Sequence, residues 1–219
     1  MDRAEIDVDG NGILFYGKAL VAACKKIKGQ QNVFSLIVNA SLERKTQVAP
    51  RAGQFYLLRS AKSSVSLDRP ISVYRAKEGK WTGKSRNLEL EFLILQKGEG
   101  TKELCSMLPN EEVELIGPLG NTFEVPDDAK NICIAGGGIG VAPVACFASS
   151  LSKKSYDFYA SFKSGFYGLE NVKAKNLVIT TDDGSYGIHG MLSEALTVSV
   201  IKEKSYDCIF ACGPLPMLS

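Results

Sequence analysis

The chain has 219 residues, of which 45% are apolar, and its formal net charge is +2. This length allows one large domain or two of about 100 residues each, and the small charge gives no indication of a nucleic acid partner. The sequence contains no apolar run long enough for a membrane-spanning helix, and its polar, acidic start is unlike a secretory signal, so we expect a cytoplasmic protein.

The cysteines and the histidine give no indication of a metal site. The six cysteines are scattered and form no C-x-x-C pair, and the single histidine is His189. We therefore expect neither a metal site built within this chain nor a disulfide framework. We expect His189 to be a loop residue before a helix.

The first part of the chain, up to about residue 125, has the pattern of an antiparallel barrel. Short apolar or alternating runs, separated by polar or glycine-containing segments, predict six strands at 19–28, 32–41, 53–60, 70–77, 88–98 and 112–120. One short helix is predicted at Thr101–Leu108, with Thr101 as its N-cap. The polar stretch 75–87 is predicted to be a solvated hairpin loop.

From Asn131 onward, strand and helix patterns alternate. Strands are predicted at 131–135, 156–162, 176–181 and 206–213, and helices at 141–151, at 190–201 and from Met217. This alternation predicts a parallel sheet with helices on its faces. We place the boundary near Pro126, which gives domains 1–126 and 127–219. Because the last predicted helix has only begun at Ser219, we expect the second domain to be truncated.

A glycine run lies where the first of these strands meets its helix. It comprises Gly136, Gly137, Gly138, Ile139 and Gly140. Glycines at the carboxyl end of a strand, followed by a helix start, are typical of a phosphate-binding loop. The run does not fulfil the G-x-G-x-x-G pattern, because Val141 and Pro143 occupy the sixth positions. A tight turn without a ligand is the alternative.

Other stretches carry similar but weaker signals. Asp182 and Asp183 follow a strand and can accept hydrogen bonds from ribose hydroxyls, which favours NAD over NADP, although Asp-Gly is also a common turn dipeptide. Arg69 and Ser72 can bind a phosphate and donate to a ring nitrogen, although an arginine at a strand start is often a surface residue. Cys212 lies at a strand's carboxyl end, where ligands bind, or is a buried packing cysteine.

In this order, the motifs RPIS, GEGT, GPLG, GGGIGVAP, TDDGS and CGPLPM resemble the ferredoxin-reductase superfamily. They look most like one branch, the electron transfer subunits of the heteromeric bacterial dihydroorotate dehydrogenase of pyrimidine biosynthesis. The resemblance covers roughly Lys18 to Ser219. It implies a flavin-binding barrel with FAD, an α/β domain with NAD, and a hetero-oligomer with a catalytic dihydroorotate dehydrogenase-type subunit, without nucleic acid or membrane.

Several related functions remain open alternatives. One is the small subunit of a sulfide dehydrogenase or of an NADH-dependent ferredoxin–NADP oxidoreductase. A flavin-less regulatory subunit and a free-standing NAD(P)H–flavin reductase are the others.

The resemblance also implies residue roles. For FAD, Arg69 would contact the pyrophosphate, Ser72 would lie near the reactive edge of the isoalloxazine, and the remaining contacts would come from Pro70, Ile71, Gly100, Thr101 and Gly120. For NAD, the run Gly136–Gly140 would hold the pyrophosphate and Asp182 and Asp183 the ribose, while the nicotinamide would lie near Cys212, Gly213 and Pro214. Cys212 and Ser72 are the candidate catalytic residues.

The chain departs from the family pattern at three places. Ile71 stands where many members have a tyrosine that stacks on the ring. The strand end Leu93, Ile94, Leu95 lacks the aromatic–arginine pair of the branch, so an FAD contact there would use the backbone only. The cysteines that bind a 2Fe–2S cluster in the branch would follow Ser219, so we expect no cluster in this chain.

Overall fold

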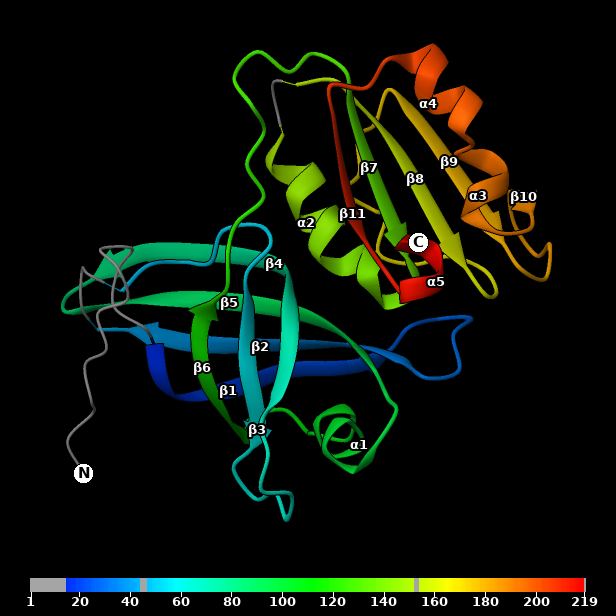
Figure 1. Ribbon diagram of the computed structural model, residues 1–219. Helices are drawn as coiled ribbons and strands as arrows, with labels where there is room; N and C mark the ends of the chain where they lie inside the picture. Colours follow the sequence, from blue (N-terminus) through cyan, green and yellow to red (C-terminus); the bar gives the residue numbers. More distant parts are fainter. Residues whose placement is uncertain (1–14, 44–46, 152–153, 219) are drawn as a thin grey trace. The chain divides into compact units, whose positions relative to one another are not determined.

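A computed structural model of the chain describes residues 15–43, 47–151 and 154–218 (Figure 1). The chain divides into two compact units, Met1–Thr122 and Phe123–Ser219. The division lies close to Pro126, where the sequence pattern changes from short strands to alternating strands and helices. Each unit has its own sheet and its own buried core.

The first unit is a closed antiparallel barrel of six strands in the order β1-β2-β5-β4-β3-β6 (Figure 1), as the sequence predicts. Its strands are β1 (Phe15–Lys26), β2 (Val33–Leu42), β3 (Phe55–Ser60), β4 (Arg69–Thr82), β5 (Ser85–Leu95) and β6 (Glu112–Leu119). The pairing of β1 with β6, from Phe15 opposite Gly117 to Leu20 opposite Glu112, closes the barrel.

The barrel core is filled by side chains from alternate positions along the strands. Because successive side chains of a strand point to opposite faces, every second residue of β2 and β5 faces inward. Fully or almost fully buried on these two strands are Leu36, Val38, Ala40, Leu42, Leu88, Leu90 and Phe92.

The stretch 75–87 is the predicted solvent-exposed hairpin, but most of it is strand and not loop. Strands β4 and β5 continue through this stretch as a long hairpin, with Trp81 opposite Arg86 and a tight turn that includes Gly83 at φ +64. The Arg86 guanidinium lies 5.4 Å from the centre of the Trp81 ring and 2.7 Å from a carboxylate oxygen of Glu78. These cross-strand contacts stabilise a segment whose Lys- and Gly-rich composition is typical of a loop.

The short helix of the barrel unit is α1 (Glu99–Cys105), and the prediction that Thr101 is its N-cap was wrong. Gly98 is the N-cap. The Thr101 hydroxyl accepts hydrogen bonds from the backbone N–H groups of Lys97 (2.9 Å) and Gly98 (3.0 Å), and it donates to the Gly98 carbonyl. Thr101 therefore lies within the first turn of the helix, and its side chain caps the backbone groups that precede the helix.

The second unit has a five-stranded parallel sheet in the order β10-β9-β8-β7-β11, which confirms the predicted α/β class. Its strands are β7 (Ile132–Gly137), β8 (Tyr156–Phe162), β9 (Asn176–Thr181), β10 (Ile188–His189) and β11 (Cys208–Cys212). The helical segments are the 3-10 turn η1 (Gly138–Gly140), α2 (Val141–Ser150), α3 (Leu192–Ala195), α4 (Val198–Lys204) and α5 (Leu215–Leu218).

Helices cover both faces of this sheet (Figure 1). Cys133 and Ala135 of β7 pack with Leu192 of α3 and Val200 of α4. On the other face, the rings of Phe147 of α2 and Phe210 of β11 pack in a tilted arrangement with their centres 4.6 Å apart. The central strands β7 and β8 are therefore buried between helices on both faces, as their almost continuous apolar runs require.

Two details of the second unit differ from the sequence expectation. The single helix predicted at 190–201 is two short helices, because the Thr197 hydroxyl accepts a hydrogen bond from Val200 N–H at 3.2 Å and begins α4 anew. His189 is not in a loop but in the two-residue strand β10, with Nε2 3.1 Å from the Asp182 carbonyl oxygen. No helix of the described residues is both long and apolar enough to cross a membrane.

Candidate functional site

The strongest anion-binding feature of the barrel is the contact between Arg69 and Gly100. Arg69 begins β4, opposite Leu58 of β3, and Gly100 lies in the first turn of α1. A Cβ atom built on Gly100 would lie 2.8 Å from one terminal guanidinium nitrogen of Arg69 and 2.9 Å from its Cζ, and still closer to Nε. The guanidinium therefore occupies the space of the missing side chain, beside the start of the helix.

The start of α1 presents free backbone donors beside this guanidinium. The first intrahelical bond runs from Lys102 N–H to the Gly98 carbonyl at 2.9 Å, so the N–H groups before Lys102 have no partner of this kind. The single hydroxyl proton of Thr101 is bound to Gly98, so Thr101 could reach an anion only through its backbone N–H. Amides and guanidinium together form a site for a phosphate or diphosphate.

Further along β4, Pro70 and Ser72 share one face of the strand and Arg69 and Ile71 the other. Ile71 lies opposite the buried Tyr56, and Ser72 opposite Phe55. Arg69 and Ser72 therefore point to opposite faces of β4.

The strand end Leu93–Leu95 and the turn at Gly120 contribute less to such a site. Leu93 and Ile94 are buried in the barrel core, and only Leu95 is exposed. Gly120 has a φ of +81, and its carbonyl accepts a hydrogen bond from the Gln54 side chain at 3.1 Å. Side-chain contacts of a ligand with Leu93 and Ile94 are therefore excluded unless the core rearranges.

In the second unit, the glycine run is mostly filled by the chain itself. Gly136 has no room for a Cβ because Val144 Cγ2 and Val141 Cα lie at 3.0 and 3.1 Å from that position. A Cβ on Gly137 would collide with Met217 Sδ, and one on Gly140 would lie 2.5 Å from the carbonyl oxygen of Cys212. These three glycines allow close packing of the strand with α2 and with the segment after β11.

Gly138 is different from its neighbours. Its φ is +52, a left-handed conformation, and a Cβ built there would meet nothing within 4 Å. It follows the carboxyl end of β7, where the strand order reverses between β8 and β11, and such switch points are where parallel sheets bind ligands. Gly138 and the adjoining Ile139 are therefore the part of the run that a ligand can approach.

Cys212 ends β11 opposite Gly136 of β7, so it lies beside the glycine run. Its thiol is partly buried, and burial raises the pKa of the Cys212 thiol above its ordinary value. The group is therefore a neutral thiol near pH 7, which can pack or donate weakly. The following Gly213 lies under the Met217 side chain, and Pro214 lies beside Gly137.

The two acids after β9 differ in their contacts. The Asp183 carboxylate accepts a hydrogen bond from Ser185 N–H at 3.0 Å, and bonds from Ser185 and Ser164 lower the pKa of Asp183. Among the described residues, the Asp182 carboxylate has no partner. Asp183 therefore closes the turn, whereas Asp182 is available to a ligand.

Comparison with known proteins identifies the family. No family model matches the chain. The electron transfer subunit of dihydroorotate dehydrogenase B (NAD(+)) from Clostridium acetobutylicum is 34% identical over 196 residues, which are 89% of this chain and 72% of that protein. The subunit of the same name from Clostridium perfringens is 30% identical over 194 residues, which are 86% of this chain and 70% of that protein. The chain belongs to this family.

Known structures support the same fold for this member of the family of dihydroorotate dehydrogenase B electron transfer subunits. The ferredoxin reductase in carbazole 1,9a-dioxygenase is 17% identical, with a TM-score of 0.71, and the match covers 94% of this chain and 63% of that one. The predicted two-domain fold, an antiparallel barrel followed by an α/β unit, is thus confirmed.

Sequence reasoning missed three residues near the candidate sites of this family member. Met217, expected only as the start of a helix, covers Gly137 and Gly213 with its thioether. Ser63 and Ser64 donate to the Glu103 carboxylate of α1, which lies one turn after Gly100. Nothing in the sequence joins Ser63 to Glu103, since their contact depends on the barrel fold.

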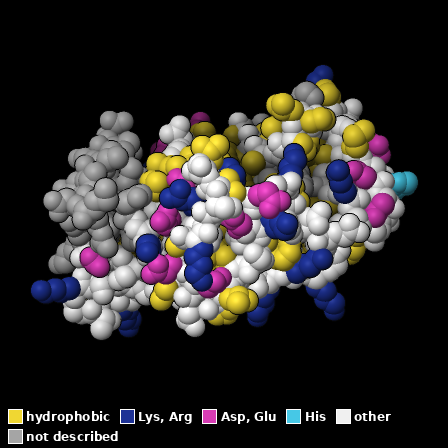
Figure 2. Space-filling view, turned by 90° about the horizontal axis from the view of Figure 1, so that it is seen from below, with side chains coloured by type: hydrophobic (Ala, Val, Ile, Leu, Met, Phe, Trp, Pro, Cys, Tyr) yellow, Lys and Arg dark blue, Asp and Glu magenta, His cyan; other side chains and the backbone are white. Residues whose placement is uncertain are grey.

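On the face drawn in Figure 2, the acidic and basic side chains of the described residues are interspersed. Within the described ranges, no group of three or more His, Cys, Asp or Glu residues is placed to hold a metal ion.

Proposed function

We propose that this electron transfer subunit binds FAD in its barrel unit and NAD(H) in its α/β unit, and passes electrons between NADH and a catalytic dihydroorotate dehydrogenase-type partner subunit in the cytoplasm. The names of its relatives support the reaction and the partner. The two candidate sites described above support the cofactors.

The contact of Arg69 with Gly100 is the observation that carries the flavin assignment. A guanidinium offers a planar fork of donors that matches a diphosphate, and the N–H groups of Gly100 and Thr101 add backbone donors of the same polarity. Ser72 is placed two strand positions beyond Pro70, on the other face from Arg69, where it would serve the ring end of an extended FAD.

In the second unit, Gly138 and Ile139 would receive the NAD diphosphate, and Asp182 would accept hydrogen bonds from the adenosine ribose. The carboxylate at Asp182 would repel a 2′-phosphate, which favours NAD over NADP. Cys212, Gly213 and Pro214 would line the nicotinamide end. Because its thiol is neutral, Cys212 would position the ring by contact and would not act as a base.

FAD and NAD(H), when bound, supply the hydride and electron transfer chemistry. The protein therefore needs no acid–base residue in the transfer itself. Its own residues bind the two phosphate groups, orient the rings and exclude water.

The flavin assignment is tested with Arg69→Ala. The purified wild-type protein is expected to show flavin absorption bands that bleach on addition of NADH. The variant is expected to bind FAD at least about tenfold more weakly in a fluorescence titration, since it loses charged hydrogen bonds to a phosphate. Lys62→Ala is the matched control, because it removes one positive charge from an exposed site of the same unit, where the Lys62 ammonium lies 3.1 Å from a carboxylate oxygen of Glu111.

A wild-type protein that stays colourless after incubation with FAD contradicts the flavin assignment and favours the flavin-less regulatory alternative. Equal FAD affinity of Arg69→Ala and wild type contradicts the role of Arg69 alone.

A further inference from the structure

Arg69 is a cation without a counterion in the part of the chain that the structure describes. Its guanidinium makes no hydrogen bond or ion pair with the described residues. Two carboxylates are nevertheless close to it, since Asp68 precedes it in the chain and Glu103 lies one helical turn after Gly100, on the same side of α1. Each of them is held by other partners.

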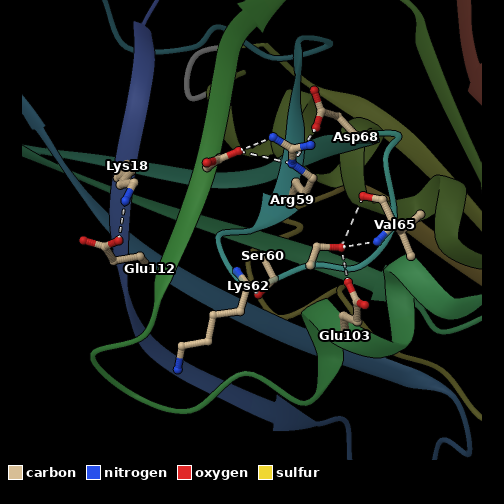
Figure 3. Close-up of polar contacts among 10 residues, drawn as sticks. Lys18, Arg59, Ser60, Lys62, Val65, Asp68, Glu103 and Glu112 are labelled. Carbon is tan, nitrogen blue, oxygen red and sulfur yellow. Dashed lines mark hydrogen bonds and ion pairs between the residues drawn. The ribbon is translucent and has the colours of Figure 1, made fainter. Parts of the chain in front are cut away.

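Asp68 is held by Arg59 (Figure 3). The Arg59 Nε lies 3.4 Å from Oδ1 of Asp68, while a terminal nitrogen of Arg59 lies 2.6 Å from Oε2 of Glu114. Arg59 thus links Asp68 to the neighbouring strand β6, so the Asp68 carboxylate is paired with Arg59 and not with Arg69.

Glu103 is held by the loop between β3 and β4. The hydroxyl of Ser63 donates to Oε2 of Glu103 (labelled in Figure 3), and the hydroxyl and the N–H of Ser64 donate to Oε1 at 3.1 and 3.4 Å. The Ser63 hydroxyl also accepts a hydrogen bond from Val65 N–H at 3.0 Å, which fixes its direction.

The electrostatic effect of Arg69 reaches Glu103 although the two form no ion pair. The hydrogen bond from Ser63 is the main cause that lowers the pKa of Glu103, the bonds from Ser64 contribute, and the charge of Arg69 lowers it further. Glu103 is therefore an anion close enough to attract the guanidinium, and the serines determine where its oxygens lie.

We propose that Ser63 and Ser64 are positioning residues that keep the Glu103 carboxylate from pairing with Arg69, so that the guanidinium stays available to the diphosphate of a dinucleotide. An arginine–carboxylate pair would use the same donors that a phosphate needs. This inference rests on the proposed flavin site, and it assigns to the β3–β4 loop a role in cofactor affinity.

The test compares FAD affinity in four proteins by fluorescence titration. Ser63→Ala/Ser64→Ala is expected to bind FAD about tenfold more weakly than wild type, because Glu103 is then free to pair with Arg69. Adding Glu103→Gln to this double variant is expected to restore most of the affinity, since the competing charge is gone. Ser66→Ala, in the same loop and exposed, is the control and is expected to match wild type.

A purely structural role of the serines predicts the opposite pattern, in which the triple variant binds FAD as weakly as the double variant or more weakly. That result, or an unchanged affinity of the double variant, overturns the inference. If the double variant does not fold, Glu103→Gln alone decides, because it should bind FAD at least as tightly as wild type and a tenfold loss contradicts the proposal. Absence of FAD binding by the wild-type protein contradicts the proposed function instead.

Discussion

At the scale of single residues, the four glycines of the run at 136–140 have different physical roles although they look alike in sequence. Gly140 faces backbone atoms, with Cys212 C and Gly213 Cα at 2.7 and 2.8 Å from a Cβ position. Gly138 faces open space. Glycine is therefore required at position 140 by close packing. At position 138 it is required by the left-handed backbone and by the approach of a ligand.

We therefore expect Gly140→Ala to lower the free energy of unfolding by roughly 1–3 kcal/mol, because backbone must move to admit the methyl group. Gly138→Ala should lower the free energy of unfolding by only about 1–2 kcal/mol, because alanine is strained in a left-handed backbone conformation. It should nevertheless weaken NADH binding by more than this loss of stability explains. Urea unfolding and NADH titration of both variants measure this. A loss of NADH affinity in Gly138→Ala that is no larger than in Gly140→Ala would contradict the assignment.

Asp207 provides a second residue-scale prediction. Its carboxylate accepts hydrogen bonds from the N–H groups of Lys130 and Asn131, both at 2.8 Å, and these bonds lower the pKa of Asp207. A carboxyl with a lowered folded-state pKa stabilises the fold above its ordinary pKa of about 3.9, and this stabilisation is lost as the pH falls through the folded-state value.

Unfolding free energies measured from neutral pH down into the acid range should thus fall more steeply in wild type than in Asp207→Asn, whose amide does not titrate. Parallel pH profiles of the two proteins would show that the Asp207 bonds do not contribute to stability.

At the scale of secondary structure elements, β3 contains a buried hydroxyl without a partner. Tyr56 is 0% exposed, its ring packs edge-on against Phe92 at 6.0 Å, and its hydroxyl bonds to none of the described residues. Burial also raises the pKa of Tyr56, so the group stays neutral.

Tyr56→Phe is therefore expected to stabilise the barrel by about 1 kcal/mol, since an unsatisfied buried hydroxyl is removed without changing the ring. Tyr159→Phe is the matched control, because the Tyr159 hydroxyl lies 3.2 Å from that of Tyr206 and its loss should destabilise the second unit. Thermal unfolding of both variants checks the two opposite signs.

The elements also show what could be predicted from sequence. The alternation of Leu36, Val38 and Ala40 reveals an inward face within one strand, so the barrel strands were predictable. The hairpin at 75–87 was also predicted, but its strand structure was not, because it is held by pairs such as Trp81 with Arg86, which only the fold brings together. In the candidate site, the glycine run was recognisable from sequence. That only Gly138 in the run is open was not, because the space at Gly137 and Gly140 is filled by Met217 and Cys212, which lie far along the chain.

At the scale of the whole molecule, the proposed electron flow from NADH to flavin would require both units. The Asp182 carboxylate, which has no partner among the described residues, is the charge that should discriminate against a 2′-phosphate. We expect NADH to bleach the bound flavin under anaerobic conditions at least about tenfold more efficiently than NADPH, a difference of roughly 1.4 kcal/mol. Asp182→Asn should narrow this ratio.

Stopped-flow absorption measures the flavin reduction by each nucleotide. Asp183→Asn is the matched variant, because Asp183 is bound within its turn and should affect selectivity less. A ratio of one in wild type, or an unchanged ratio in Asp182→Asn, would contradict the role of Asp182.

The sheet order of the second unit has a consequence for synthesis of the protein. Strand β7 is the first strand of this unit to be made and β11 the last, yet the two are neighbours from Ile132 beside Cys208 to Gly136 beside Cys212. Until β11 leaves the ribosome, one edge of an almost wholly apolar strand has no hydrogen-bonding neighbour. Pairing between strands so distant in sequence is slow, and exposed apolar edges promote aggregation. A nascent chain stalled before β11 should therefore depend on chaperones.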